Sequence, residues 1–109
     1  MHTKEGIEVT CPDCRGPLSL QRTDTLVEVR CLVGHTYSPQ GVLTAHSEAQ
    51  EKALWSALVA LKETSPLLDA IADQLPPERV ERLRAQVAKK QAQAAVLQKL
   101  LEELEPFQP

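Results

Sequence analysis

The residues in this chain best suited to chemistry are three cysteines and one histidine. Cys11 and Cys14 flank a Pro-Asp dipeptide and Cys31 stands four positions before His35, which gives the pattern C-x2-C-x16-C-x3-H. Zinc prefers four sulfur or nitrogen ligands at the corners of a tetrahedron. The spacing therefore predicts one structural Zn²⁺ held by Cys11, Cys14, Cys31 and His35.

Each ligand pair can sit on its own tight turn. Pro12 helps to set the first turn, and Gly34 lets the second bend back because glycine tolerates φ > 0. Two alternatives stay open at this point. A C-x-x-C redox couple would need Cys11 at a helix N-terminus, where its pKa would be lowered. An iron–sulfur cluster usually takes four thiolates, and the chain has three.

Four protein ligands fill a tetrahedral site, so the predicted metal is structural rather than catalytic. No activated nucleophile accompanies it in the sequence, and we expect a protein that is not an enzyme. His46 and His2 lie outside the pattern. We expect His46 to be solvated and His2 to belong to a loose terminus.

Composition limits the classes of protein. The chain has 109 residues, a net charge of -3 and only 3 % aromatic residues. An acidic balance disfavours non-specific nucleic-acid binding, which depends on Lys and Arg neutralising phosphates. No apolar run approaches the length of a membrane span, and no segment resembles a signal peptide. We expect a cytoplasmic location, where thiols stay reduced.

Two segments of different composition must position the ligands, and they predict an α+β fold. Residues 1–37 contain all the cysteines and three of the four glycines. Short strands over 6–10, 17–21 and 25–30, with a turn at 22–24, would form a zinc-ribbon-like unit. Such short strands bury little surface, so this unit needs the metal as a staple.

Residues 38–109 predict a helical region. Ser38 and Pro39 suit a helix start, and a short helix is expected over 39–45. Ser47 would cap a long helix over 47–75, kinked or restarted at Ser65 and Pro66. The "LPPE" segment separates it from a helix over 77–104. Leucines and weaker members recur every three or four positions in both, which predicts an antiparallel helical hairpin. The predicted stripes are Leu54, Leu58, Leu61, Ser65, Leu68, Ala72 and Leu75 in the first helix, and Val80, Leu83, Val87, Lys90, Ala94, Leu97, Leu101 and Leu104 in the second.

The stretch "CPDCRGPLSL…VEVRCLVGHTYSPQGVLTAHSEAQEKALWSAL" resembles a known family region. It is similar to the C-terminal region of atypical bacterial proteins that carry a CheB-type protein-glutamate methylesterase domain. There a "CPxCGG" knuckle is followed by "RCxVGHxYS" and by a helix with an "ALW.AL" core. The resemblance covers about residues 8–75. It implies the same four metal ligands, a Tyr37 packed where ribbon meets helix, and a Trp55 that anchors the long helix.

Two departures from that family pattern matter. Arg15 stands where glycine is common, which predicts a slightly strained first knuckle. The methylesterase domain is absent and no G-x-S-x-G nucleophile motif is present, so ester hydrolysis does not carry over. What the resemblance implies is an association with chemotaxis-like or two-component signalling.

The expected function is therefore a zinc module that mediates protein–protein interaction. The hairpin stripes leave apolar surface that a second copy could cover, and a homodimer is expected. The alternative is a zinc-ribbon transcriptional regulator that binds nucleic acid. Residues 1–37 carry four Lys and Arg against five Asp and Glu, a net charge of -1 before the thiolates are counted. This charge makes nucleic acid the less favoured partner.

Overall fold

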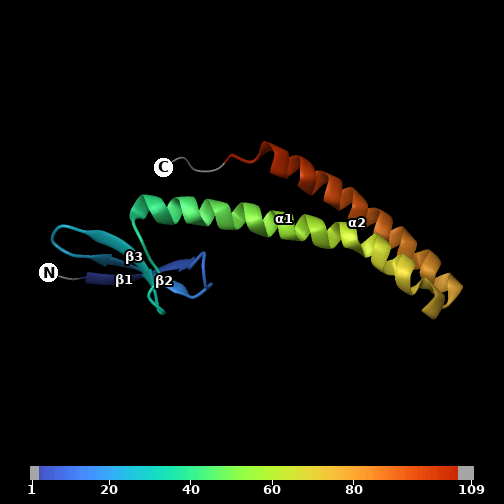
Figure 1. The fold of residues 1–109 in the computed structure, drawn as a ribbon, viewed down its shortest axis with the longest axis horizontal. Coiled ribbons are helices and arrows are strands. Elements are labelled where there is room, and N and C mark those ends of the chain that lie inside the picture. The colour runs from blue at the N-terminus through green and yellow to red at the C-terminus, as the bar shows by residue number, and fades with distance from the viewer. Residues whose placement is uncertain (1–2, 106–109) are drawn as a thin grey trace. The chain divides into compact units, whose positions relative to one another are not determined.

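The computed structural model describes residues 3–105 and shows an antiparallel sheet followed by two long helices (Figure 1). This confirms the predicted α+β fold. By their internal contacts the residues form two compact units. One comprises the described residues up to Gln50 together with Glu105, and the other spans Glu51–Leu104.

The sheet has four strands in the order β1-β2-β3-β4, each antiparallel to its neighbour: β1 Thr3–Thr10, β2 Pro17–Arg22, β3 Val27–Cys31 and β4 Thr36–Tyr37. The three predicted strands exist, and β1 begins three residues earlier than expected. The short β4 was not predicted, because two residues carry no periodic signal. The β2–β3 turn is closed at Thr23, whose Oγ1 accepts a hydrogen bond of 3.1 Å from the Leu26 amide.

The core of the first unit is small. Four buried residues form it, and partly buried apolar side chains pack around them: Cys11, Leu18, Val29 and Cys31 at the centre, with Ile7, Leu20, Tyr37 and Val42 outside. Two of the four central residues are predicted metal ligands. The apolar core of this unit is therefore small, and half of its central residues are cysteines.

Helix α1, Pro39–Ile71, begins as the sequence predicts. The Ser38 side chain caps it, with Oγ accepting a hydrogen bond of 2.9 Å from the Gly41 amide. Pro39 fills the first helical position, where its missing N–H costs nothing. A Cβ at Gly41 would lie 2.8 Å from Ser38 Oγ, so glycine leaves room for the cap.

The predicted break between a short helix over 39–45 and a long one over 47–75 is wrong. Helix α1 runs unbroken for 33 residues and contains both Ser47 and Pro66. Ser47 is buried inside the helix and does not cap an N-terminus. Its neighbours from Leu43 to Gln50 include no glycine or proline, so nothing in the local sequence stops the preceding helix from continuing.

Pro66 neither ends nor restarts the helix. It removes one backbone hydrogen bond, at a cost of about 3 kcal/mol in a helix interior. Leu61 is half-buried and Leu68 is buried, so packed residues flank the proline on both sides. The helix ends at Ile71, earlier than predicted, and a 3₁₀ turn (η1, Ala72–Gln74) leads to the Pro76–Pro77 bend.

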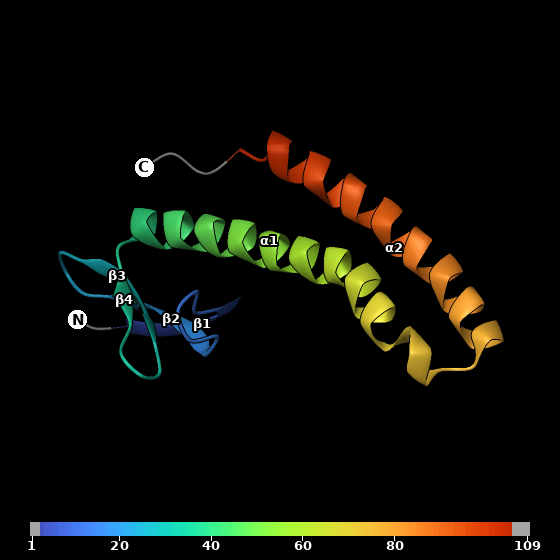
Figure 2. The same ribbon diagram turned by 45° about the vertical axis from the view of Figure 1, so that its right-hand side comes forward.

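Helix α2, Pro77–Glu103, completes the hairpin of the second unit (Figure 2). The predicted stripes are its packed surface, since the stripe members other than Lys90 are buried or half-buried: Leu54, Leu58, Leu61, Ser65, Leu68, Ala72 and Leu75 before the bend, and Val80, Leu83, Val87, Ala94, Leu97, Leu101 and Leu104 after it. Lys90 is exposed because its charge must reach water. We name the buried and half-buried members, without Lys90, the packed stripes.

One exposed ion pair joins the two helices and marks which residues stand at the same level. Arg84 Nη1 lies 2.8 Å from Asp69 Oδ1, and each residue stands one position after a packed-stripe member. Trp55 occupies an equivalent position, and its side chain is 49 % exposed. The anchoring role that the family resemblance implied for Trp55 is therefore not seen.

Candidate metal centre

The fold brings the four predicted ligands together. Cys11 follows β1, Cys14 ends the turn before β2, Cys31 ends β3, and His35 lies in the loop between β3 and β4. Their sulfur and ring-nitrogen atoms all lie within 4.8 Å of one another. Two backbone turns far apart in sequence thus converge because β2 and β3 pair between them, with Leu18 opposite Cys31.

The first turn is a tight knuckle built by backbone hydrogen bonds. The Arg15 amide donates to the Cys11 carbonyl at 2.8 Å, and the Cys11 amide donates to the Gly16 carbonyl at 2.7 Å. Arg15 has φ 65°, in the left-handed region that costs a side-chain-bearing residue about 1–2 kcal/mol. The strain expected from an arginine in place of glycine is confirmed.

The second turn repeats this arrangement. The Gly34 amide donates to the Cys31 carbonyl at 3.2 Å, and the Cys31 amide donates to the His35 carbonyl at 3.0 Å. The His35 amide also points at Cys31 Sγ, 3.3 Å away. Gly34 has φ 102°, which confirms the predicted role of glycine at this bend. N–H groups aimed at sulfur favour the thiolate, the form that binds metal.

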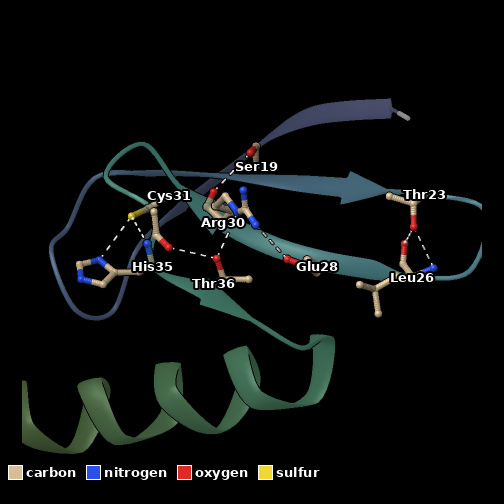
Figure 3. A network of polar contacts seen from close by, with 9 residues as sticks. Ser19, Thr23, Leu26, Glu28, Arg30, Cys31, His35 and Thr36 are labelled. Carbon is tan, nitrogen blue, oxygen red and sulfur yellow. Dashed lines mark hydrogen bonds and ion pairs between the residues drawn. The ribbon is translucent and has the colours of Figure 1, made fainter. Parts of the chain in front are cut away.

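Polar side chains brace the second turn on the sheet side (Figure 3). Arg30 Nε donates to Thr36 Oγ1 at 3.1 Å, and the Thr36 hydroxyl donates to the Gly34 carbonyl at 3.0 Å. Arg30 also pairs with Glu28 along β3 at 3.3 Å. These contacts tie the strand ends together, so the loop that carries His35 is held at both sides.

The donor distances fit a tetrahedral metal. Cys14 and Cys31 sulfur atoms are 3.7 Å apart, and His35 Nδ1 lies 3.3 Å from Cys31 Sγ and 3.7 Å from Cys11 Sγ. Zn–S bonds of about 2.3 Å and Zn–N bonds of about 2.0 Å at tetrahedral angles require edges of about 3.8 Å and about 3.5 Å. These three of the six donor–donor distances therefore match a tetrahedral site, and the other three are no longer than 4.8 Å.

Burial and hydrogen bonding oppose each other at the two core thiols. Burial raises the pKa of Cys11, but the hydrogen bond with the Tyr37 hydroxyl and those from the backbone of Cys14 and Asp13 outweigh it and bring the pKa to about 6. Burial likewise raises the pKa of Cys31, while hydrogen bonds led by the His35 amide lower it below its usual value. Both thiols are therefore prepared to ionise.

The two exposed ligands shift the other way. The backbone hydrogen bond from Gly16 lowers the pKa of Cys14, but burial and the neighbouring thiols Cys31 and Cys11 prevail and raise it. The same two thiols raise the pKa of His35 through hydrogen bonds to its ring. Negative charge is thus concentrated on the donors, which is the electrostatic setting that a cation neutralises.

Tyr37 is a supporting residue whose bonding the sequence did not reveal. It packs against the buried core cluster, and Val42 of α1 packs against the same cluster. Its hydroxyl lies 3.3 Å from Cys11 Sγ and within hydrogen-bonding distance of the Asp13 carboxylate, so its single proton serves one of these two acceptors at a time. Burial, together with these two partners, raises the pKa of Tyr37, so the phenol keeps its proton. In the sequence, the only hint of this contact is Asp13 inside the first knuckle, since its carboxylate can accept a hydrogen bond.

The remaining histidines differ from the predicted ligands. His46 lies in α1, where its Nδ1 is 3.2 Å from the Gln50 amide nitrogen. It is half-buried rather than fully solvated, and it lines an apolar cavity of about 280 Å³ with Ile7, Val9, Leu18, Val29, Val42 and Leu43. His2 lies outside the described residues.

The alternative of a redox couple finds no support in the local structure. All three cysteines are free thiols, and Cys11 follows a strand rather than starting a helix.

The described part of the chain has no helix long and apolar enough to span a membrane. Comparison of the chain with protein-family models, with curated proteins and with solved structures finds no match.

Proposed function

We propose that this protein is a non-enzymatic module in which Cys11, Cys14, Cys31 and His35 hold one structural Zn²⁺. The observation that carries the proposal is the convergence of four donor atoms within 4.8 Å on two backbone knuckles. One imidazole and three thiols are a preferred zinc set. Oxygen-preferring cations such as Mg²⁺ and Ca²⁺ would find no suitable ligand here.

The role of this metal is to hold the first unit together. All four positions of a tetrahedral ion would be occupied by protein side chains, so none is left for a substrate or an activated water. The unit's core consists of four residues, and two of them are ligands. Metal-binding free energy would therefore supply folding free energy that the small core lacks.

The function of the module is protein binding through its helical hairpin. Exposed apolar side chains remain on both helices after the packed stripes are buried, including Leu67 at 60 % and Val96 at 71 %. Exposed apolar clusters on a hairpin favour a protein partner over nucleic acid, which the charge of the ribbon also disfavours. A place in chemotaxis-like or two-component signalling rests on the family resemblance of residues 8–75.

Cobalt substitution tests the ligand set directly. Co²⁺ added to metal-free protein should give the intense visible absorption of tetrahedral sulfur-rich coordination. The His35→Ala variant should weaken and shift these bands, whereas the matched His46→Ala variant should leave them unchanged. Identical spectra for wild type and His35→Ala would remove His35 from the site, and the absence of tetrahedral bands in wild type would overturn the proposal.

A further inference from the structure

One open side of the helical hairpin carries a second, unused apolar stripe on α1. Each of its members stands one position before a packed-stripe residue, so together they follow the same steps of three and four: Ala53, Ala57, Ala60, Thr64, Leu67 and Ile71. Thr64 is half-buried and the others are exposed, Leu67 by 60 % and Ile71 by 42 %. We name this set the second stripe. A helix needs apolar residues this far around its circumference when it faces more than one other helix.

The opposite open side of the hairpin is occupied by polar contacts. It consists of the positions one after the packed stripes, where Asp69 and Arg84 form their ion pair. Lys62, Gln91 and Gln98 line a groove there. Most of this side is suited to water, although the exposed Trp55 and Val59 also lie on it. The second stripe contains no charged residue, so it is the side suited to a helix.

The second stripe is complementary to itself when reversed. Its first half is made of alanines and its second half ends in the bulky Leu67 and Ile71. If two α1 helices pack antiparallel around position 62, Ala53 meets Ile71 of the partner subunit. Ala57 then meets Leu67 of the partner subunit, and Ala60 meets its Thr64. Alanines facing large residues at the two outer levels, and the smaller Thr64 at the level nearest the axis, allow two helices to stay in even contact.

The corresponding positions on α2 are complementary in charge at its two ends, while Lys89 near the centre lies opposite the neutral Gln93 of the partner subunit. Reversal around position 91 places Arg79 opposite Glu103 of the partner subunit, and symmetry repeats this pair at the other end. Arg82 then lies opposite Leu100 of the partner subunit, where its aliphatic stem can cover the exposed leucine. Opposite charges at both ends favour this antiparallel register over a parallel one, which would bring like charges together.

The two centres of symmetry coincide. Asp69 lies seven residues after position 62, and Arg84 lies seven residues before position 91. Because the helices are antiparallel and these two side chains bond at 2.8 Å, positions 62 and 91 stand at the same level of the hairpin. One two-fold axis therefore satisfies both the size pattern of α1 and the charge pattern of α2.

We propose that two copies of this chain form a four-helix bundle through the second stripe, with α1 antiparallel to α1 and α2 antiparallel to α2. Such an interface is isologous, since each copy offers the same patch. The inference deepens the proposed protein-binding function and rests on it, by naming the partner as a second copy and the register as that of positions 62 and 91.

Light scattering and native mass spectrometry of the full zinc-loaded chain test the surface. Wild type should be a dimer of about 24 kDa, twice the 12.0 kDa of one chain. Ala57→Glu buries two unpaired charges and should raise the dimer dissociation constant on the order of 100-fold or more. Ala95→Glu makes the same change at an exposed position on the polar side and should leave the dimer intact. Circular dichroism of both variants checks that the helices persist.

Charge reversal tests the register. Arg79→Glu and Glu103→Arg each create two like-charge contacts and should each weaken the dimer about tenfold. The double variant restores opposite charges across the axis and should return the dissociation constant to the wild-type value. Failure of the double variant to recover would overturn the antiparallel register. A monomeric wild type at high micromolar concentration, or a dimer broken by Ala95→Glu rather than Ala57→Glu, would overturn the interface.

The metal content of each sample separates this inference from the zinc site. A zinc-loaded monomer would overturn the dimer and leave the metal proposal standing. A dimer that contains no zinc would overturn the metal proposal and leave the interface standing.

Discussion

The behaviour of the candidate metal centre is decided by individual backbone angles and hydrogen bonds. Both knuckles use a residue with positive φ, but one has glycine there and the other has Arg15. Spacing was sufficient to predict which four side chains meet, because C-x-x-C and C-x3-H turns leave few alternatives. The same spacing could not show that Tyr37 approaches Cys11 and Asp13, since that contact depends on the pairing of β4 with β3.

Exchanging the residues at the positive-φ positions should change stability in opposite directions. Arg15→Gly removes left-handed strain and should raise the free energy of unfolding by up to about 1 kcal/mol, part of the gain being offset by the freer unfolded chain. Gly34→Ala introduces the same strain and should cost about 1 kcal/mol, although its Cβ would have no neighbour within 4 Å. Chemical denaturation of the zinc-loaded protein measures both. Gly6→Ala, in β1, is the control and should be nearly neutral; equal effects of all three would refute the strain argument.

Loss of the Tyr37 hydroxyl should weaken metal binding without unfolding the sheet. Tyr37→Phe keeps the ring against the core but removes the hydroxyl near Cys11 Sγ. Partners of ligating groups typically contribute 10- to 100-fold to affinity, and we expect a loss of about tenfold. Competition with a chromophoric chelator measures it, with Trp55→Phe as a control far from the ligands in sequence. An unchanged metal affinity for Tyr37→Phe would show that the hydroxyl does not support metal binding and that Tyr37 contributes only the packing of its ring.

At the scale of elements, the sequence predicted the existence of strands and helices better than their boundaries. The packed stripes were predicted almost residue by residue, because a period of 3.5 is a strong signal over long helices. The break near Ser47 was wrongly predicted from a capping motif. A capping motif marks a helix start only where no helix precedes it. Helix α1 continues through Ser47 without interruption.

The proline inside α1 should be a weak point that can be removed. Pro66→Ala restores a backbone hydrogen bond in the helix interior and should stabilise the hairpin by about 1–3 kcal/mol. Pro77→Ala, at the first position of α2, is the matched control and should have little effect or be slightly unfavourable. Denaturation followed by helical circular dichroism compares them. Destabilisation by Pro66→Ala would contradict this and would indicate that the packing of the hairpin depends on the helix geometry that Pro66 imposes.

At the scale of the whole molecule, the two units differ in what stabilises them. The hairpin has its own buried residues, Leu58, Leu68, Val87 and Ala94, and none of these is a candidate metal ligand. The sheet unit has a core made partly of ligands. The sequence predicted two segments of different composition. It could not show that α1 belongs to both units, because composition does not reveal where contacts change along one continuous helix.

Metal removal should therefore unfold one unit and spare the other. With a strong chelator, the amide NMR signals of residues 3–37 should collapse to unfolded positions. Those of Glu51–Leu104 should keep their helical shifts, because the packed stripes remain buried. Complete loss of helical signal on chelation would show that the hairpin depends on the metal.

The measurement that tests the account most directly is the metal content of the purified protein, read by native mass spectrometry together with elemental analysis. We predict one zinc per wild-type chain and its loss in Cys31→Ser, which removes a buried ligand. A folded, metal-free protein with Cys11 and Cys14 joined in a disulfide would contradict the account and return the C-x-x-C motif to redox chemistry.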